Sequence, residues 1–278
     1  MGCLNSTSAF SHVFGNIHLS GPCNRKCYFC IGQHMMALDS ENNLDTWPLT
    51  NIDKFVEQCL ERGVKEVNLT GTNTDPLLYK HAGKLTDYLR KHIPGVKLGI
   101  RTNGVHSIGN YWWYDKMSVS VCSLDGEINK KMMGGQPGAV EFFANTFGND
   151  FKVNIILGPE NTRDGDLFRT LKRLVLMGVT RVNLREPYGQ PHIGDPMASL
   201  CIPSSPRLGM PVYQWGPMEV TYWDVHYVEV ESVNLYANGR VSSDYPITRG
   251  HAESGEVHDQ SFFPGGRVRE QWMTLRRK

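Results

Sequence analysis

The sequence has no long uncharged apolar run and no surplus of charge of one sign. A membrane-spanning helix needs roughly 20 consecutive apolar residues, and a secretory signal needs a basic segment ahead of an apolar one. Neither pattern occurs in the 278 residues, and 29 Lys and Arg stand against 28 Asp and Glu. A large nucleic-acid footprint usually requires a basic stripe. We therefore expect a soluble cytoplasmic protein, and the composition favours neither a membrane nor nucleic acid as its partner.

The cysteines also do not indicate a disulfide framework, because there are seven of them, an odd number, and no signal peptide pattern is present. Three of them, Cys23, Cys27 and Cys30, lie close together in the stretch SGPCNRKCYFCIG. Three thiolates leave a tetrahedral metal site one ligand short, and no second ligand pair follows at zinc-finger spacing. The stretch therefore predicts a metal centre with one open position. A structural zinc site and a chance grouping are the alternatives.

Apolar strand-like runs alternate with segments of helical periodicity through the first two thirds of the chain. The strand-like runs are VFGNIHL, VKEVNLTG, VKLGIRTNG, KMSVSVCSLDG, FKVNIILGPEN and VTRVNLREPYG. Strands joined by helical crossovers form parallel sheets, and their regular succession is typical of a barrel. We predict an α/β fold, a partial (β/α)6 TIM-like barrel over residues 1–188, with the cysteine loop at residues 23–30 on the C-terminal side of its strands.

The composition changes after residue 188. The segment GQPHIGDPMASLCIPSSPRLGMP is rich in Pro, Gly and Ser and predicts a loop. The segment EVTYWDVHYVEVESVNLYANGRVSSDYPI predicts strands with a hairpin turn at Asn238-Gly239. We expect residues 189–278 to form a loop and a β-rich cap that covers the barrel mouth.

The segment CNRKCYFC matches the motif C-x3-C-x-aromatic-C, with Phe29 in the aromatic place. On this motif the chain resembles the radical S-adenosylmethionine enzymes, in which three cysteines hold a 4Fe-4S cluster and the fourth iron binds S-adenosylmethionine. The resemblance implies an enzyme that cleaves this cofactor reductively to a 5'-deoxyadenosyl radical, using a reductant such as flavodoxin or ferredoxin. Independently of the resemblance, thiolates suit iron–sulfur clusters, and an iron without a protein ligand can bind a further molecule.

The end of the second strand resembles another motif of these enzymes. Their second strand usually ends in GGEP, which receives the amino group of the cofactor, and LTGTNTDPLL stands in this place with extra residues. Gly71 matches the glycine, and the resemblance makes Gly71, Thr72, Asn73 and Asp75, together with Phe29 of the cysteine motif, candidate residues for binding S-adenosylmethionine. The alternative is a polar turn that caps a helix beginning at Pro76.

Later strand ends carry further resemblances. IRTNG is similar to the TNG of the pyranopterin-cyclase and peptide-maturase branches, which makes Asn103 a candidate substrate ligand. VCSLDG resembles their SLDG and makes Ser123 and Asp125 candidate cofactor ligands, with a capping serine and a turn aspartate as the alternative. Two more strand ends, LGPEN and LREPYG, add the cofactor candidate Asn161 and the substrate candidates Arg185, Glu186 and Tyr188.

Beyond residue 122 the only further cysteine is Cys201. Pyranopterin cyclases and many peptide maturases carry C-terminal cysteines for auxiliary clusters, so this departure disfavours a pyranopterin cyclase. The sequence therefore predicts a single-cluster enzyme that acts on a small polar metabolite or nucleotide-like molecule. A peptide-modifying maturase is the first alternative. A non-catalytic iron–sulfur binding or sensor protein is an alternative of another class.

Overall fold

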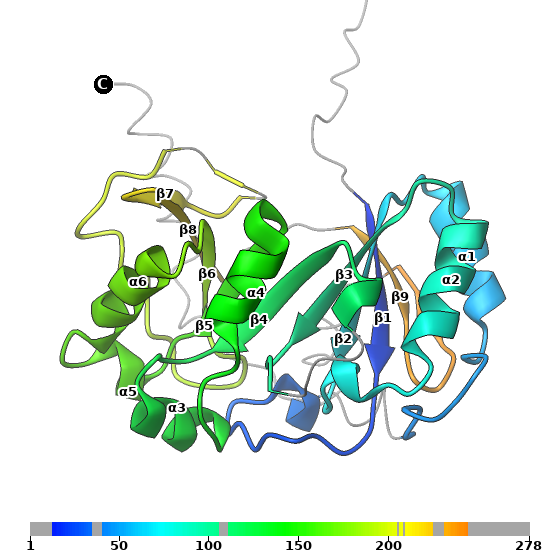
Figure 1. The fold of residues 1–278 in the computed structure, drawn as a ribbon, viewed down its shortest axis with the longest axis horizontal. Coiled ribbons are helices and arrows are strands. Elements are labelled where there is room, and N and C mark those ends of the chain that lie inside the picture. The colour runs from blue at the N-terminus through cyan, green and yellow to red at the C-terminus, as the bar shows by residue number, and fades with distance from the viewer. Residues whose placement is uncertain are drawn as a thin grey trace, which may run out of the picture.

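The computed structural model describes residues 13–34, 41–105, 111–204, 206–207, 209–224 and 231–243. In this part of the chain ten strands form one sheet, in the order β10-β9-β1-β2-β3-β4-β5-β6-β8-β7 (Figure 1). The strands are β1 (Phe14–Leu19), β2 (Glu66–Gly71), β3 (Lys97–Thr102), β4 (Lys116–Val121), β5 (Phe151–Ile156), β6 (Arg181–Arg185), β7 (Val212–Trp215), β8 (Met218–Trp223), β9 (Ser232–Leu235) and β10 (Val241–Ser242).

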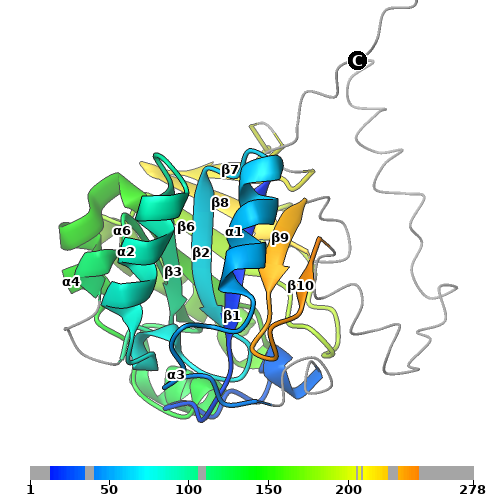
Figure 2. The ribbon, with the colours of Figure 1, turned by 90° about the vertical axis from the view of Figure 1, so that its right-hand side faces the viewer.

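Helices follow the barrel strands, as the helical periodicity predicts. The α-helices are α1 (Ile52–Glu61), α2 (Ala82–His92), α3 (Gly126–Met133), α4 (Val140–Phe147), α5 (Pro159–Thr162) and α6 (Asp166–Leu176), and the 3-10 helices are η1 (Ile31–His34), η2 (Pro76–Leu78), η3 (Tyr111–Trp113) and η4 (Gly148–Asp150). Figure 2 shows α1 and α2 side by side on the outer face of the sheet.

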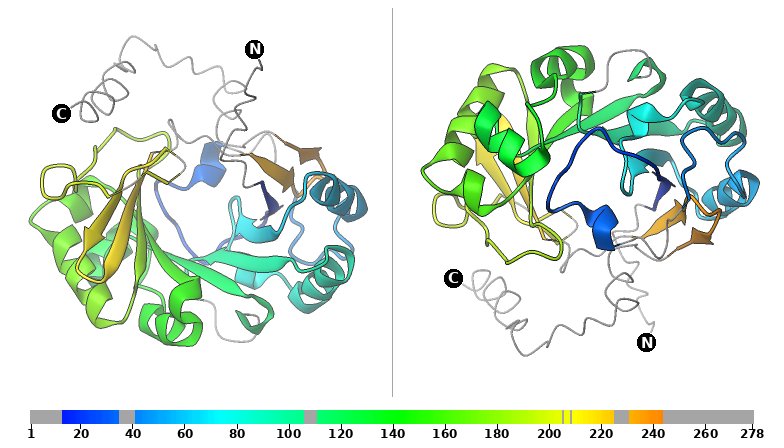
Figure 3. Two further views of the ribbon diagram at one scale, coloured as in Figure 1. Left: turned by 90° about the horizontal axis from the view of Figure 1, so that it is seen from above. Right: turned by 90° about the horizontal axis from the view of Figure 1, so that it is seen from below.

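Strands β1 to β6 pair in chain order and all in parallel. Seen along the barrel axis, the sheet curves into an incomplete ring with the α-helices outside it (Figure 3). This arrangement confirms the predicted α/β fold with a partial barrel. Among the described helices, none combines the length and the apolar character that crossing a membrane requires.

The strands after residue 188 join the same sheet. On one side β8 pairs in parallel with β6, and β7 adds an antiparallel edge. On the other side β9 pairs in parallel with β1, and the predicted hairpin turn at Asn238-Gly239 leads into β10. The described strands of the expected cap thus lengthen the barrel sheet at both ends. The alternation of side chains along a strand does not predict this pairing, because it is the same for a strand in a cap and for a strand in a barrel.

The two faces of the barrel strands differ in polarity. Ile17 and Leu19 on β1 are fully buried toward the helices, where an apolar core also takes in Phe55 of α1. Asn16 and His18, between them along β1, point to the inner side, because successive side chains of a strand face opposite ways. The fold therefore places polar side chains inside the ring, below the ends of the strands from which the cysteine loop starts.

Candidate active site

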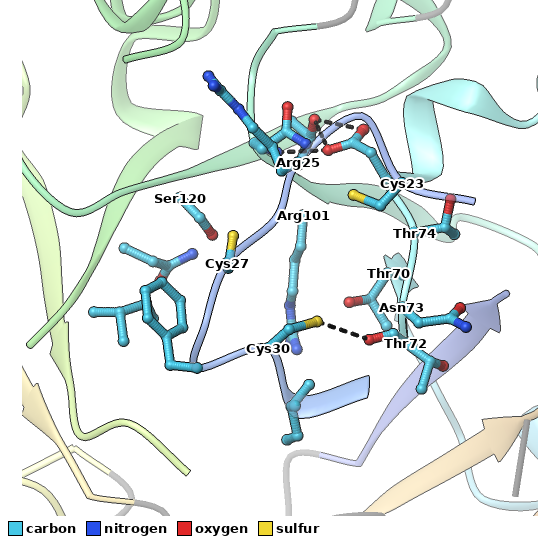
Figure 4. Close-up of a pocket in the computed structure, with 18 of the residues that line it drawn as sticks. Cys23, Arg25, Cys27, Cys30, Thr70, Thr72, Asn73, Thr74, Arg101 and Ser120 are labelled. Atoms are coloured by element: carbon cyan, nitrogen blue, oxygen red, sulfur yellow. Dashed lines mark hydrogen bonds between the residues drawn. The ribbon is translucent and has the colours of Figure 1, made fainter. Parts of the chain in front are cut away.

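The cysteine loop leaves β1 and crosses the ring opening at the C-terminal side of the strands (Figure 3). Figure 4 shows the sulfur atoms of Cys23, Cys27 and Cys30 facing a common space. The backbone of the loop is folded locally, since the N–H of Cys30 donates to the carbonyl of Cys27 at 3.2 Å. It is also anchored from outside, because the N–H of Lys26 donates to the carbonyl of Met133 at the end of α3, also at 3.2 Å.

The loop lies against the backbone that follows β2. A Cβ atom added at Gly32 would lie 2.5 Å from the carbonyl oxygen of Thr72, so glycine is needed for this approach. The sulfur of Cys30 lies 3.9 Å from the same carbonyl oxygen (Figure 4). A Cβ atom at Gly71 would lie 1.8 Å from the carbonyl oxygen of Thr74, so the turn after β2 also requires its glycine. The motif glycine is therefore explained by backbone packing.

The thiols have the chemistry that an iron–sulfur cluster needs. Burial raises the pKa of Cys23, and burial together with the neighbouring cysteines raises the pKa of Cys27 to about 12, with Arg25 acting in the opposite direction. Bound iron would supply the positive charge that makes them thiolates. No three His, Cys, Asp or Glu side chains among the described residues are placed to hold a single metal ion. In a cubane each thiolate binds a different iron, so the ligands surround a space and need not meet at one ion.

The cysteines close one end of a cavity of about 260 Å³ that extends into the barrel. Most of the predicted site residues line it. These are Cys23, Cys27, Phe29, Cys30, Gly71, Thr72, Asn73, Asp75, Asn103, Arg185, Glu186 and Tyr188. The three other predicted site residues, Ser123, Asp125 and Asn161, are not among the lining residues.

A chain of hydrogen bonds joins the cysteine loop to the end of β2. The side-chain oxygen of Asn73 accepts from the hydroxyl of Ser20 at 2.9 Å and from the N–H of Gly21 at 3.0 Å. The hydroxyl of Thr74 donates to the carbonyl of Pro22 at 2.8 Å. These contacts hold the first residues of the loop, so Asn73 positions the loop whether or not it also contacts a cofactor.

Asp75 joins the end of β2 to the end of β3. Its carboxylate accepts from the N–H of Leu77 at 3.0 Å, which caps η2 as the alternative interpretation of this segment predicted. It also accepts from the hydroxyl of Thr102 at 2.8 Å and from the N–H of Asn103 at 2.6 Å. The side-chain amide of Asn103 then donates to Asn24 of the cysteine loop at 2.7 Å. A buried carboxylate thus joins two strand ends beside the cavity and, through Asn103, connects them to the cysteine loop.

Ser123, Asp125 and Asn161 form hydrogen bonds inside the outer layer of the barrel. The hydroxyl of Ser123 accepts from the N–H of Asp125 at 2.8 Å, and Asp125 caps α3 through the N–H groups of Glu127 and Ile128. The side-chain amide of Asn161 donates to the carbonyls of Cys122 and Ile156, and its oxygen accepts from the N–H of Gly158. Ser123 and Asn161 are fully buried. Their observed contacts are those of residues that hold loops in place.

The substrate candidates line the cavity from the last residue of β6 and the segment directly after it. Arg185 lies 5.8 Å from the ring centre of Trp223. Glu186 is almost fully buried and accepts from the N–H groups of Ile193 and Gly194 and from the hydroxyl of Tyr222 at 2.7 Å. Tyr188 packs against Ile31 and Trp223. Of the three, the Arg185 side chain is the one that brings positive charge to the cavity.

The inner barrel wall carries polar residues that no motif in the sequence marks. Asn16, His18, Thr70, Arg101, Ser120 and Asn154 line the cavity from five strands. Burial lowers the pKa of His18 to about 4, with Arg101 adding to the effect and a hydrogen bond to Asn234 opposing it. His18 is therefore neutral at pH 7 and stacks on Tyr236 with ring centres 4.9 Å apart. The signal for these residues was their alternation with apolar residues along strands that helices cover.

The fold and the site together define a class of protein, a partial β/α barrel with a three-cysteine loop at the ends of its parallel strands. The family model of the Radical SAM superfamily matches residues 17–174, more than half of the chain. The chain belongs to the radical SAM superfamily. The enzymes of this family use a 4Fe-4S cluster and S-adenosylmethionine as cofactors, and they need a reductant and a substrate.

Individual relatives are more distant. The GTP 3',8-cyclase of Helicobacter pylori is 30% identical over 98 residues, which cover 34% of this chain and 29% of that protein. Among solved structures, Streptococcus suis SuiB bound to S-adenosylmethionine matches with a TM-score of 0.56 and 12% identity, over 84% of this chain and 58% of SuiB. SuiB bound to the precursor peptide SuiA matches with a TM-score of 0.51 and 17% identity, over 64% of this chain and 40% of SuiB. The chain thus spans less than two thirds of these proteins, and the structural matches show a shared fold.

Proposed function

We propose that this chain is a single-cluster radical S-adenosylmethionine enzyme that acts on a small polar or nucleotide-like metabolite inside its barrel. The observation that carries the proposal is the cavity that runs from Cys23, Cys27 and Cys30 to polar side chains of the inner wall. The similarity to a GTP 3',8-cyclase supports a nucleotide-like substrate. We also propose that a cytoplasmic flavodoxin or ferredoxin supplies the electron.

The chain's own residues would prepare the chemistry. When bound, the cluster and S-adenosylmethionine supply a 5'-deoxyadenosyl radical that takes a hydrogen atom from the substrate. Cys23, Cys27 and Cys30 would hold the cluster, and the negative charge of Asp75 would attract the ammonium group of the cofactor. The buried inner wall excludes water from the radical and orients the substrate.

The proposal of one cluster follows from the remaining cysteines. Cys59 is fully buried in the main apolar core, and burial raises its pKa to about 12. Cys122 is fully buried against Phe29 and two methionines, and Cys201 is half-buried in a loop. Cys3 lies outside the described residues. No two of these four are neighbours in sequence, as cluster ligands usually are.

The direct test is anaerobic reconstitution followed by reduction in the presence of S-adenosylmethionine. We expect about four iron and four sulfide per chain, the content of one cubane, and formation of 5'-deoxyadenosine. Replacing Cys59, Cys122 and Cys201 by Ser should preserve this iron content. Iron near twice this level, lost in the triple variant, would contradict the single cluster.

Peptide modification is the second candidate, and the fold shared with SuiB, which was crystallised with a precursor peptide, favours it. An edge strand that pairs with a peptide would be needed. In the described chain the sheet ends in β7 and in the two-residue β10. Fractionating a cell extract by size and assaying each fraction for substrate-dependent 5'-deoxyadenosine separates the candidates. Stimulation by the small-molecule fraction alone supports the metabolite.

A further inference from the structure

Three strands direct long cationic side chains toward the interior of the barrel. Arg101 of β3 and Arg185 of β6 line the cavity directly. Lys152 of β5 shares a strand face with Asn154 and Ile156, which also line it, because alternate residues point the same way. The residues between them along the strands, such as Val153 and Ile155, are fully buried on the outer side. The cations therefore lie inside the ring because of strand alternation.

The sheet register brings Arg101 and Lys152 to one level of the barrel. Arg101 is the partner of Ser118 on β4, and Ser118 is the partner of Lys152 on β5. The hydroxyl of Ser118 is buried and has no hydrogen-bond partner. Arg101 lies 6.0 Å from the ring centre of Phe14, and neither Arg101 nor Lys152 is within salt-bridge distance of an acidic side chain of the described chain. Both cations thus face a polar interior without a matching anion there.

The acidic groups nearby have other partners. Glu66 lies 2.5 Å from the amine of Lys116. Glu186 accepts from two backbone N–H groups and from Tyr222, and Asp75 accepts from Thr102 and two backbone N–H groups. Among the described residues, these carboxylates are therefore engaged elsewhere and form no ion pair with Arg101 or Lys152.

Lys152 is affected by the cations around it. Burial lowers its pKa to about 7, and the charges of Arg101, Arg185 and Arg181 add to the effect while Glu66 opposes it. Arg101, Lys152 and Arg185 are half-buried, and cations that repel one another away from water are costly unless an anion pairs with them. A bound anion would reverse the effect and favour the charged lysine.

We propose that Arg101, Lys152 and Arg185 form a binding site for a multiply charged oxyanion of the substrate, such as the phosphate groups of a phosphorylated metabolite. Arginine offers paired N–H donors and lysine a point charge, the combination that suits phosphate. Ser118, Ser120 and Asn154 lie on the inner faces of the two strands in the same region and add neutral polar groups. The inference rests on the proposed function, whose substrate class it narrows.

Inorganic pyrophosphate is a suitable probe. It is titrated calorimetrically, at constant ionic strength, into protein that carries its cluster and is saturated with S-adenosylmethionine. We expect saturable binding at one site. Arg101→Gln and Lys152→Gln should each weaken it at least tenfold, because each removes a charged hydrogen bond. Lys84→Gln on the exposed side of α2 removes the same charge outside the barrel and should leave the affinity unchanged.

Several outcomes would overturn the proposal. Absence of saturable binding is one, and equal affinity in the two barrel variants and Lys84→Gln is another. The carboxylate of S-adenosylmethionine is a competing ligand for these cations, so the cofactor is titrated into the same variants without pyrophosphate. A tenfold loss of cofactor affinity with unchanged pyrophosphate binding would assign the cations to the cofactor and overturn the proposal.

Two further measurements complete the test. Circular dichroism checks that the variants are folded. Arg101→Lys keeps the charge and loses the paired donors, so it should bind pyrophosphate more tightly than Arg101→Gln. Pyrophosphate binding needs no turnover. Binding that depends on Arg101 and Lys152 in a protein that forms no 5'-deoxyadenosine would therefore refute the proposed function and leave the anion site standing.

Discussion

Polar residues at the ends of β2 and β3 and those at the ends of β4 and β5 look alike in sequence but occupy different places. Asp75 and Asn103 line the cavity and tie the cysteine loop to the strand ends. Ser123 and Asn161 are fully buried and bond to backbone or neighbouring side chains outside the cavity. A polar residue at a strand end can therefore line the site, or it can stabilise the loops outside it. Substitutions of the first kind should lower cofactor affinity, and those of the second kind should lower the free energy of unfolding.

The largest effect is expected in the cysteine loop itself. Cys27→Ala should abolish 5'-deoxyadenosine formation and most of the bound iron, because a cubane loses one of three protein ligands. The free energy of unfolding before reconstitution should change little, since Cys27 lies on a loop at the strand ends and not in the main core. Cys201→Ala is the matched control and should keep both iron and activity. Full turnover by Cys27→Ala would refute the cluster assignment.

Asn161→Ala tests whether a polar residue outside the cavity acts on stability alone. It leaves two carbonyls and the N–H of Gly158 without their partner, so we expect a loss of about 3 kcal/mol of unfolding free energy. The measurement is urea denaturation, with the exposed Asn149→Ala as a control that should change little. Affinity for S-adenosylmethionine, measured at low temperature where the variant is folded, should stay within about twofold. A loss of affinity for S-adenosylmethionine without a loss of unfolding free energy would show that Asn161 contributes to cofactor binding.

Asp75→Asn tests whether a polar residue that lines the cavity contributes to cofactor binding. The change keeps the size of the side chain and removes the negative charge, so we expect S-adenosylmethionine to bind about tenfold more weakly, or about 1.4 kcal/mol. Asp115→Asn is a close control, because Asp115 also accepts from a backbone N–H, that of Leu98, at 2.8 Å, yet does not line the cavity. Equal cofactor affinity in both variants would show that Asp75 is only a structural cap.

Ser123→Ala should give the smallest effect. It removes the acceptor for the N–H of Asp125 and should lower the unfolding free energy by about 1 kcal/mol. Ser118→Ala is matched in burial, but its hydroxyl has no partner, so the unfolding free energy should not fall. Cofactor affinity of Ser123→Ala should be unchanged. A tenfold weaker affinity would instead support the cofactor role that the resemblance implies for Ser123.

The sequence predicted the barrel because apolar runs and helical periods are local signals. It also predicted the cysteine loop, since three ligands in one short segment need no distant partner to be recognised. It did not predict that β8 and β9 join the barrel sheet, because pairing depends on strands far away in sequence. Arg101 and Lys152 were missed for a related reason. Whether a cation on one strand contributes to a site depends on the residues that other strands place opposite it, and the sequence of that strand alone does not show those residues.

The pairing of β1 with β9 has a consequence for the order in which the protein is made. The side-chain amide of Asn16 donates to Asn234, 218 residues later in the chain. At roughly 5 to 20 residues per second, the ribosome needs on the order of 10 to 45 s to supply that partner. During this time β1, from which the cysteine loop starts, lacks its β9 neighbour and stands at the edge of the sheet. Metal loading in the cell is therefore expected to follow synthesis, and until then the nascent strand needs protection from association with other chains.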